Sequence, residues 1–189
     1  MSSIIPLEEI KLFVHDDVTK DDMKDICFRL VRREVALRYI NILETDDEAK
    51  IAELDNEVSM FPLTFGIACE EANIELDKDL TVDIAARLTM LMRGIEKFRN
   101  DGIMKKLGKL ICQMSYEEDT LWIEMGKTFM EHDTSRSILI LIEKTARIEA
   151  LENACAELIF SGELNDVQAN TLMIKRNELI KSYLFFTSA

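Results

Sequence analysis

The sequence predicts an all-α protein, and three observations support that fold class. Apolar residues recur at spacings of three and four along most of the 189 residues, which is the period of an amphipathic helix. Capping patterns of Ser, Thr or Asp followed by acidic residues precede several of these segments. Only 6 Gly and 2 Pro are present, too few for the many tight turns of an all-β chain. We therefore expect a bundle of about eight antiparallel helices joined by short connections.

Individual signals set the expected helix boundaries. Thr19, with Asp22 three residues later, forms a capping box that opens a long helix. Thr45–Glu48 and Ser115–Glu118 repeat this pattern, so a helix is expected to begin at each, while Pro62 separates two further helices. After a short helical piece over 7–14, the expected helices cover about residues 19–43, 51–58, 63–76, 81–99, 103–111, 115–132, 135–160 and 165–185.

The last two expected helices form an αα-hairpin around the break at Ser161-Gly162-Glu163. Their apolar positions follow a heptad-like spacing, so the helices are expected either to pack on each other and on the bundle or to contact a partner. These positions are Leu141, Ile148, Leu151, Cys155 and Leu158 on one helix and Val167, Leu172, Leu179 and Tyr183 on the other.

No low-complexity linker divides the chain, so we expect one all-α domain over residues 1–189, with a weak seam near residues 100–102. Each of the four cysteines lies inside an apolar helical pattern, and no CxxC motif is present. They are therefore expected to be buried thiols in a reducing compartment. Because the sequence has neither a signal peptide pattern nor an apolar run of membrane-spanning length, we expect a cytoplasmic protein without a membrane span. The cysteines are Cys27, Cys69, Cys112 and Cys155.

The charge balance restricts the class of partner. The chain has 23 Lys and Arg against 36 Asp and Glu, a formal net charge of −13. Such a chain repels the phosphate backbone of nucleic acids, so we expect no direct nucleic-acid binding. A basic partner would complement it.

Motifs for catalysis or metal binding are missing from the sequence. Gly126-Lys127 has Leu121 where a phosphate-binding loop requires glycine, and neither His15 nor His132 follows a glutamate by three residues. Glu117, Glu124 and Glu131 share one helix face with Lys127, which is typical of a solvated, ion-paired surface. We therefore predict no enzymatic activity, catalytic residue, metal or cofactor; the alternative of an all-α enzyme without a recognisable motif stays open.

Two groups of residues are candidates for partner binding. Arg29, Arg32 and Arg33 share a face of the second helix, with Arg38 nearby, and this cluster reverses the sign of an otherwise acidic chain. It is predicted either to grip an anionic group on a partner or to pair with the protein's own carboxylates. A smaller basic face at Lys105, Lys106 and Lys109 has the same two interpretations. The second candidate group is the apolar C-terminus, with Tyr183, Phe185 and Phe186, which is expected to fold back or to dock into another chain.

These observations favour a non-enzymatic protein–protein interaction or assembly factor, such as a subunit, an adaptor or a chaperone-like protein, which acts through helical surfaces. Its partner would be another protein or further copies of itself. The alternative binding function is that of an acidic inhibitor, a DNA mimic that occupies a nucleic-acid-binding protein.

Overall fold

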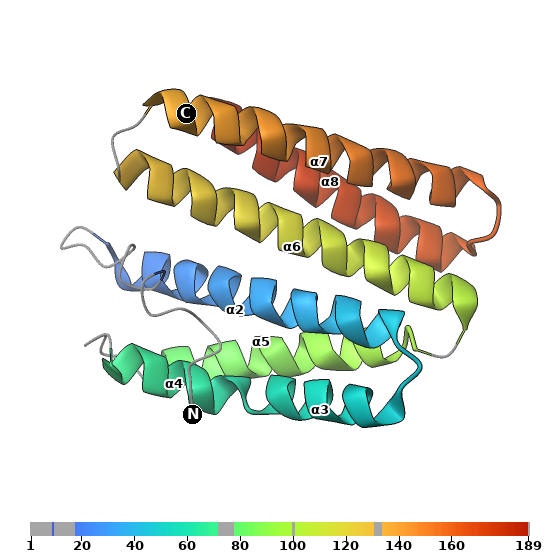
Figure 1. The fold of residues 1–189 in the computed structure, drawn as a ribbon, viewed down its shortest axis with the longest axis horizontal. Helices are drawn as coiled ribbons and strands as arrows, with labels where there is room; N and C mark the ends of the chain where they lie inside the picture. Colours follow the sequence, from blue (N-terminus) through green and yellow to red (C-terminus); the bar gives the residue numbers. More distant parts are fainter. Residues whose placement is uncertain (1–8, 10–17, 72–77, 100, 131–133, 189) are drawn as a thin grey trace. The chain divides into compact units, whose positions relative to one another are not determined.

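The computed structural model describes Glu9 and residues 18–71, 78–99, 101–130 and 134–188 (Figure 1). Within these ranges the secondary structure consists of seven α-helices, and no strand occurs. The all-α prediction is therefore confirmed, with seven described helices instead of the expected eight. The short helical piece predicted over residues 7–14 lies outside the described residues, except for Glu9.

The chain divides into two compact units, Met1–Glu96 (unit 1) and Lys97–Ala189 (unit 2). The boundary lies just before the seam predicted near residues 100–102. The negative charge is distributed unequally between the units. Unit 1 has 22 Asp and Glu against 11 Lys and Arg, whereas unit 2 has 14 against 12, so most of the net charge of −13 belongs to unit 1.

Unit 1 is organised around its first long helix, α2 (Lys20–Glu44), which packs against α3 (Glu48–Ser59) and α5 (Lys78–Glu96). The fourth helix, α4 (Phe61–Glu71), packs against α3 and α5. Apolar side chains at helical spacing along α2 make up most of the buried apolar residues that the structure describes in this unit. The buried apolar residues of α2 are Ile26, Cys27, Leu30, Val31, Val35, Ala36, Tyr39, Ile42 and Leu43.

The helix starts of unit 1 follow their capping residues. The Thr19 backbone N–H donates to Asp22 Oδ2 at 2.9 Å, and the Asp22 N–H donates to Thr19 Oγ1 at 3.2 Å, which completes the predicted capping box. The Thr19 hydroxyl also donates to the Asp22 carboxylate, and this hydrogen bond, together with the one from the Thr19 backbone N–H, lowers the pKa of Asp22. Asp47 caps α3 by accepting from the Ala49 N–H at 3.0 Å. The break between α3 and α4 falls at Met60, two residues before Pro62, because proline fits the first turn of a new helix and not the interior of an old one.

Unit 2 is a three-helix bundle of α6 (Gly102–Met130), α7 (Thr134–Phe160) and α8 (Asp166–Ser188), in which each helix contacts the other two. The predicted αα-hairpin is formed by α7 and α8. Gly162 has a φ of +74°, so the turn between them needs glycine's freedom to adopt the left-handed region. Asn165 and Gln168 then exchange hydrogen bonds of 2.9 and 3.0 Å between side chain and backbone, which caps α8.

The core of unit 2 lies between the three helices. It contains apolar residues of α6 and four residues of the αα-hairpin. These four hairpin residues all belong to the predicted heptad-like seam. Val167, which was predicted to belong to the same seam, is instead 76% exposed, because its position five residues before Leu172 places it on a different side of α8. The buried cluster consists of Leu107, Ile111, Met114, Leu121, Met125, Ile148, Cys155, Leu172 and Leu179.

The predicted helix start at Ser115 is wrong, because α6 continues without a break from Gly102 to Met130. Ser115 is a buried residue in the middle of this helix. The apolar positions Leu107, Ile111 and Met114 continue in phase to Leu121 and Met125, so a single helix buries all of them on one face. Packing of this seam outweighs the local preference of serine for a helix start.

The difference between Thr19 and Ser115 gives a direct test of these assignments. Thr19→Ala removes a cap and should lower the free energy of unfolding of unit 1 by about 1 kcal/mol. Ser115→Ala should change that of unit 2 by less than about 0.5 kcal/mol, because alanine is favoured inside a helix. Urea titration followed by far-UV circular dichroism monitors both units, and the single tryptophan, Trp122, reports on unit 2. If Ser115→Ala lowered the free energy of unfolding as much as Thr19→Ala does, that result would contradict a continuous α6.

Candidate interaction surfaces

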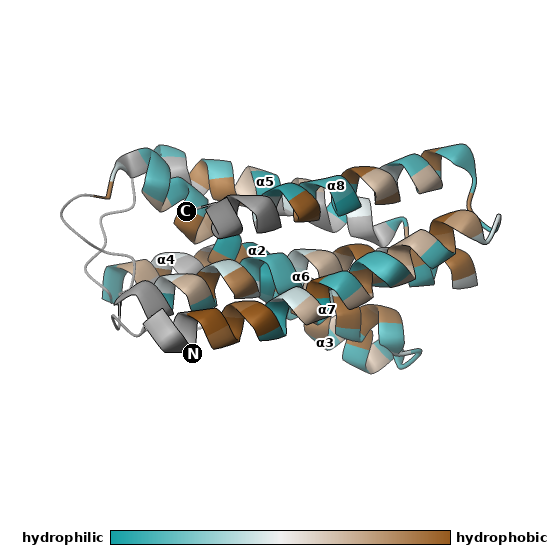
Figure 2. Ribbon diagram, turned by 90° about the horizontal axis from the view of Figure 1, so that it is seen from above, coloured by the Kyte–Doolittle hydropathy of each residue, from teal (hydrophilic) through white to brown (hydrophobic). Residues whose placement is uncertain are grey.

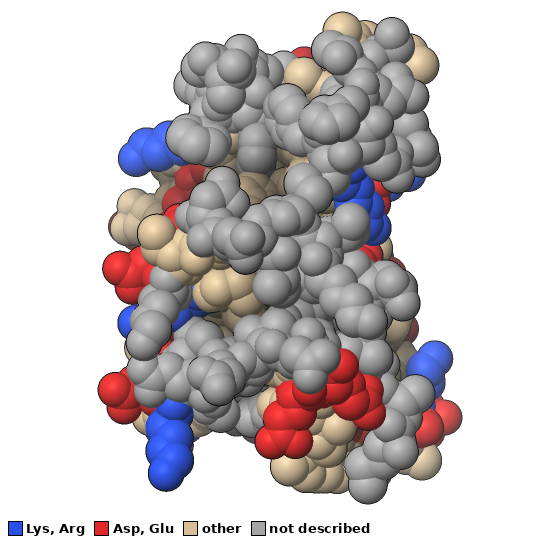
Figure 3. Space-filling view, turned by 90° about the vertical axis from the view of Figure 1, so that its left-hand side faces the viewer, with Lys and Arg blue, Asp and Glu red and all other residues tan. Residues whose placement is uncertain are grey.

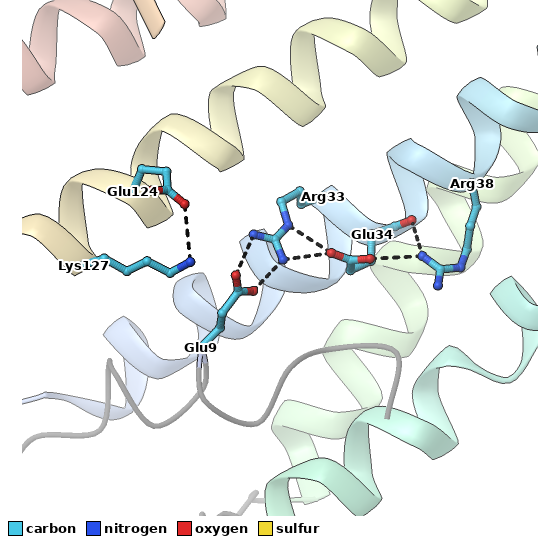
Figure 4. Close-up of polar contacts among 6 residues, drawn as sticks. All are labelled: Glu9, Arg33, Glu34, Arg38, Glu124 and Lys127. Atoms are coloured by element: carbon cyan, nitrogen blue, oxygen red, sulfur yellow. Dashed lines mark hydrogen bonds and ion pairs between the residues drawn. The ribbon is translucent and has the colours of Figure 1, made fainter. Parts of the chain in front are cut away.

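The arginine cluster of α2 contains a partly buried ion-pair network (Figure 4). Arg33, only 7% exposed, contacts Glu9 with Nη1 at 3.3 Å, and it contacts Glu34 with Nη2 at 2.8 Å and with Nε at 3.0 Å. Glu34 also accepts from Arg38 Nη1 at 3.1 Å, and Arg38 Nε reaches Glu57 of α3 at 2.8 Å. Glu34 therefore bridges two arginines, and Arg38 links α2 to α3.

The electrostatics of Arg33 result from two opposing effects. Burial disfavours the charged guanidinium, but Glu9 and Glu34 outweigh that penalty and raise the pKa of Arg33. Arg33 therefore stays charged throughout the physiological pH range. Its charge is balanced within unit 1 by these two carboxylates.

The remaining arginines of the cluster also interact within unit 1. Arg29 pairs with Asp25 one turn earlier at 3.0 Å. The guanidinium carbon of Arg32 lies 5.6 Å from the centre of the Phe28 ring, and that of Arg87 from α5 lies 5.2 Å from the same centre. The structure thus gives Arg29, Arg32 and Arg33 partners inside their own unit, as in the intramolecular interpretation. Their binding of a second molecule stays a prediction.

The C-terminal candidates lie in the last turns of α8, which extends to Ser188. The structure describes the backbone of these last turns but not the side chains of Tyr183, Phe185 and Phe186. Their docking to another chain stays a prediction. Ser182, the last residue before them, donates from Oγ to Glu118 of α6 at 2.9 Å. At this point α8 is therefore still attached to α6.

The predicted solvated carboxylate face of α6 is only partly correct. Lys127 pairs with Glu124 at 3.3 Å, as the spacing indicates (Figure 4). Glu117 has a side chain that is only 16% exposed, and its Oε1 lies 3.8 Å from Nη1 of Arg147 on α7. Its Oε2 is buried and has no hydrogen-bond partner among the described residues. Glu117 thus faces the neighbouring helix. Glu131 is outside the described residues.

Two residues of the smaller basic face, Lys106 and Lys109, line a surface groove between α6 and α7, whereas Lys105 does not belong to the lining. This hollow measures about 430 Å³ and adjoins a second one of about 600 Å³ beside the turn between α7 and α8. We call Lys106 and Lys109 of α6 the lysine rim, and Glu157 and Glu163, at and beyond the end of α7, the glutamate rim. Leu110, Ala154 and Leu158 form the floor of what we call the α6–α7 groove.

All four cysteines are buried and free, as predicted. A hydrogen bond with Cys69 and burial raise the pKa of the Cys27 thiol. Burial raises the pKa of Cys112 to about 12 and that of Cys155 to about 11. The thiols of Cys27, Cys112 and Cys155 are therefore protonated at neutral pH and are poor nucleophiles.

The largest group of exposed apolar side chains on α7 lies near its start. Ile138, Leu139 and Ile142 are 54%, 68% and 61% exposed. Figure 2 colours the ribbon as hydrophobic along the first part of α7. Their spacing places them on one side of the helix, turned away from the side that buries Ile148 and Cys155. We call these three residues the α7 stripe.

No protein-family model matches this chain, and comparisons with curated proteins and with solved structures find no match either. None of the helices in the described ranges combines the length and apolar content needed to cross a lipid bilayer. Within the same ranges, no group of three or more His, Cys, Asp or Glu side chains is arranged to hold a metal ion. The arginine cluster, the α6–α7 groove and the α7 stripe are therefore the candidate functional features of the described residues.

The arginine network predicts unequal costs for two similar substitutions on α2. Glu34→Ala leaves two partly buried arginines with fewer partners, so it should lower the free energy of unfolding of unit 1 by about 2–4 kcal/mol. Asp25→Ala is the matched control, because it breaks an exposed pair one turn apart and should cost less than about 0.5 kcal/mol. Denaturant titration of the two variants measures the difference. Equal effects would show that the network is no more important than a surface ion pair.

Proposed function

We propose that this protein is a non-enzymatic interaction or assembly factor that binds another protein through the α7 stripe. The observation that carries the proposal is the exposure of Ile138, Leu139 and Ile142 together on one side of α7. Folding leaves single apolar side chains on most surfaces, but adjacent large aliphatic residues typically mark a binding site. The partner is expected to offer an apolar helix face or groove of similar length.

The chemistry of the hollows supports binding over catalysis. The two hollows described above are lined by lysine, glutamate, aspartate, amide and aliphatic side chains, together with Ser161. The hydroxyl of an activated nucleophile donates its hydrogen bond to a base. The Ser161 hydroxyl donates instead to the backbone carbonyl of Leu158, at 2.8 Å.

A paired set of variants tests the α7 stripe. In an extract of the source cells, cross-linking with mass spectrometry on the full chain should identify one stoichiometric partner. Ile138→Asp with Ile142→Asp should reduce its capture by about tenfold or more, because central apolar residues usually contribute more than 1 kcal/mol to binding. Val167→Asp with Met173→Asp, which adds the same charge to exposed positions of α8, should leave capture unchanged.

Two results would contradict the proposal. In the first, light scattering and cross-linking find only an unbound monomer in the extract. In the second, the stripe variant captures the same partner as the unaltered chain, although circular dichroism shows that both are folded.

A second candidate function is favoured by the charge of unit 1. This unit carries 22 acidic against 11 basic residues, and Asp46, Asp47 and Glu48 are all exposed at the turn between α2 and α3. Acidic side chains also adjoin one another on the face drawn in Figure 3. We propose as the alternative that unit 1 occupies the basic surface of a nucleic-acid-binding protein.

Salt dependence tests this alternative. Binding to a basic probe, polylysine, should weaken at least about tenfold between low and high salt, because screening shortens the range of surface charges to a few Å. Asp46→Asn, Asp47→Asn and Glu48→Gln should weaken binding without loss of the α3 cap, because asparagine caps a helix as well as aspartate does. Glu143→Gln, Glu149→Gln and Glu157→Gln in unit 2 form the matched control. Binding that is independent of salt, or equally sensitive to both sets, would exclude the alternative.

A further inference from the structure

The charges on the two sides of the α6–α7 groove have opposite signs along its length. Near the end of α7, the α6 side carries the lysine rim and the opposite side carries the glutamate rim. One to two helical turns beyond Gln113 and Ala154 of the lining, the signs are reversed, with Glu117 on α6 and Arg147 on α7. At both levels a positive side chain on one side of the groove faces a negative side chain on the other side. The apolar floor lies at the level of the two rims.

This charge pattern is complementary to itself when a two-fold axis relates two copies and runs along the groove. A two-fold axis that runs along the groove places each α6 opposite the α7 of a second copy. The lysine rim of one copy then meets the glutamate rim of the other, and Glu117 meets the partner's Arg147. A two-fold axis that crosses the groove at the level of the lysine rim would instead oppose lysine to lysine. We propose that the occupant of the α6–α7 groove is a second copy of this chain, docked about the axis along the groove.

The other properties of the groove fit the same occupant. In this dimer, α6 and α7 of both copies form an antiparallel four-helix arrangement, with Leu110, Ala154 and Leu158 of each copy as its central seam. The small side chain of Ala154 permits close approach of the helices.

The dimer goes beyond the proposed function, because it uses a surface other than the α7 stripe. The two proposals can therefore fail separately. The stripe variant, Ile138→Asp with Ile142→Asp, should dimerise like the unaltered chain. Groove variants that are monomeric should still capture the partner of the α7 stripe.

Charge reversal on each rim provides the test. Sedimentation velocity of the full chain at about 100 μM should give a dimer of the 21.8 kDa chain, since transient interfaces associate in the micromolar range. The variant Lys106→Glu with Lys109→Glu, and the variant Glu157→Lys with Glu163→Lys, should each weaken dimerisation at least about tenfold through like-charge contacts. An equimolar mixture of the two variants should form the heterodimer, because an all-acidic groove then meets an all-basic one. Lys181→Glu on α8 is the control and should dimerise normally.

A cross-linking experiment on the unaltered sequence avoids any effect of substitution on folding. When chains labelled with ¹⁴N and ¹⁵N are mixed, a carbodiimide should join Lys106 of one label to Glu157 or Glu163 of the other. A chain that is monomeric at about 100 μM would overturn the proposal. Dimerisation unaffected by both rim variants, folded variants that do not associate when mixed, or cross-links confined to one label would overturn it as well.

Discussion

The apolar seam of α6 is the constraint on which the structure of unit 2 depends. Leu107, Ile111, Met114, Leu121 and Met125 occupy one side of a single helix, and this side can be buried only if α6 continues through Ser115. Both α7 and α8 then pack against it with one side each. The α7 stripe and the α6–α7 groove lie outside this shared core, so their exposure is a consequence of how the core is shared.

Unit 1 is stabilised in a different way, because charged groups contribute to its interior. Arg33 is almost fully buried in the most acidic part of the chain, and its charge is compensated by Glu9 and Glu34. Arg38 extends the same network to α3 through Glu57. A buried arginine is tolerated when carboxylates satisfy its donors, so the local excess of positive charge on α2 has a structural role within an acidic unit.

Local sequence patterns predicted much of the fold, but they could not predict contacts between residues that are far apart in the sequence. The cap at Thr19, the glycine turn at Gly162 and the burial of the cysteines depend on nearby residues and on hydrophobic spacing, so they were predictable. The partner of Arg33, Glu9, lies 24 residues away, and that of Glu117, Arg147, lies on another helix, so spacing along one helix could not identify them. Ser115 resembled a cap because tertiary packing, which overrides it, is not visible in a local pattern. The exposure of the α7 stripe depends on how α7 packs against α6 and α8, which the apolar spacing along a single helix does not show.

The continuity of α6 is tested most directly by hydrogen–deuterium exchange of the full chain, resolved to single amides or short peptides. If α6 is one helix with a buried seam, the amides from Gln113 to Asp119 should exchange as slowly as those around Ile111 and Leu121. Rapid exchange confined to Gln113–Asp119, between two protected segments, would show that the helix breaks there. That result would contradict the three-helix bundle and the surfaces derived from it.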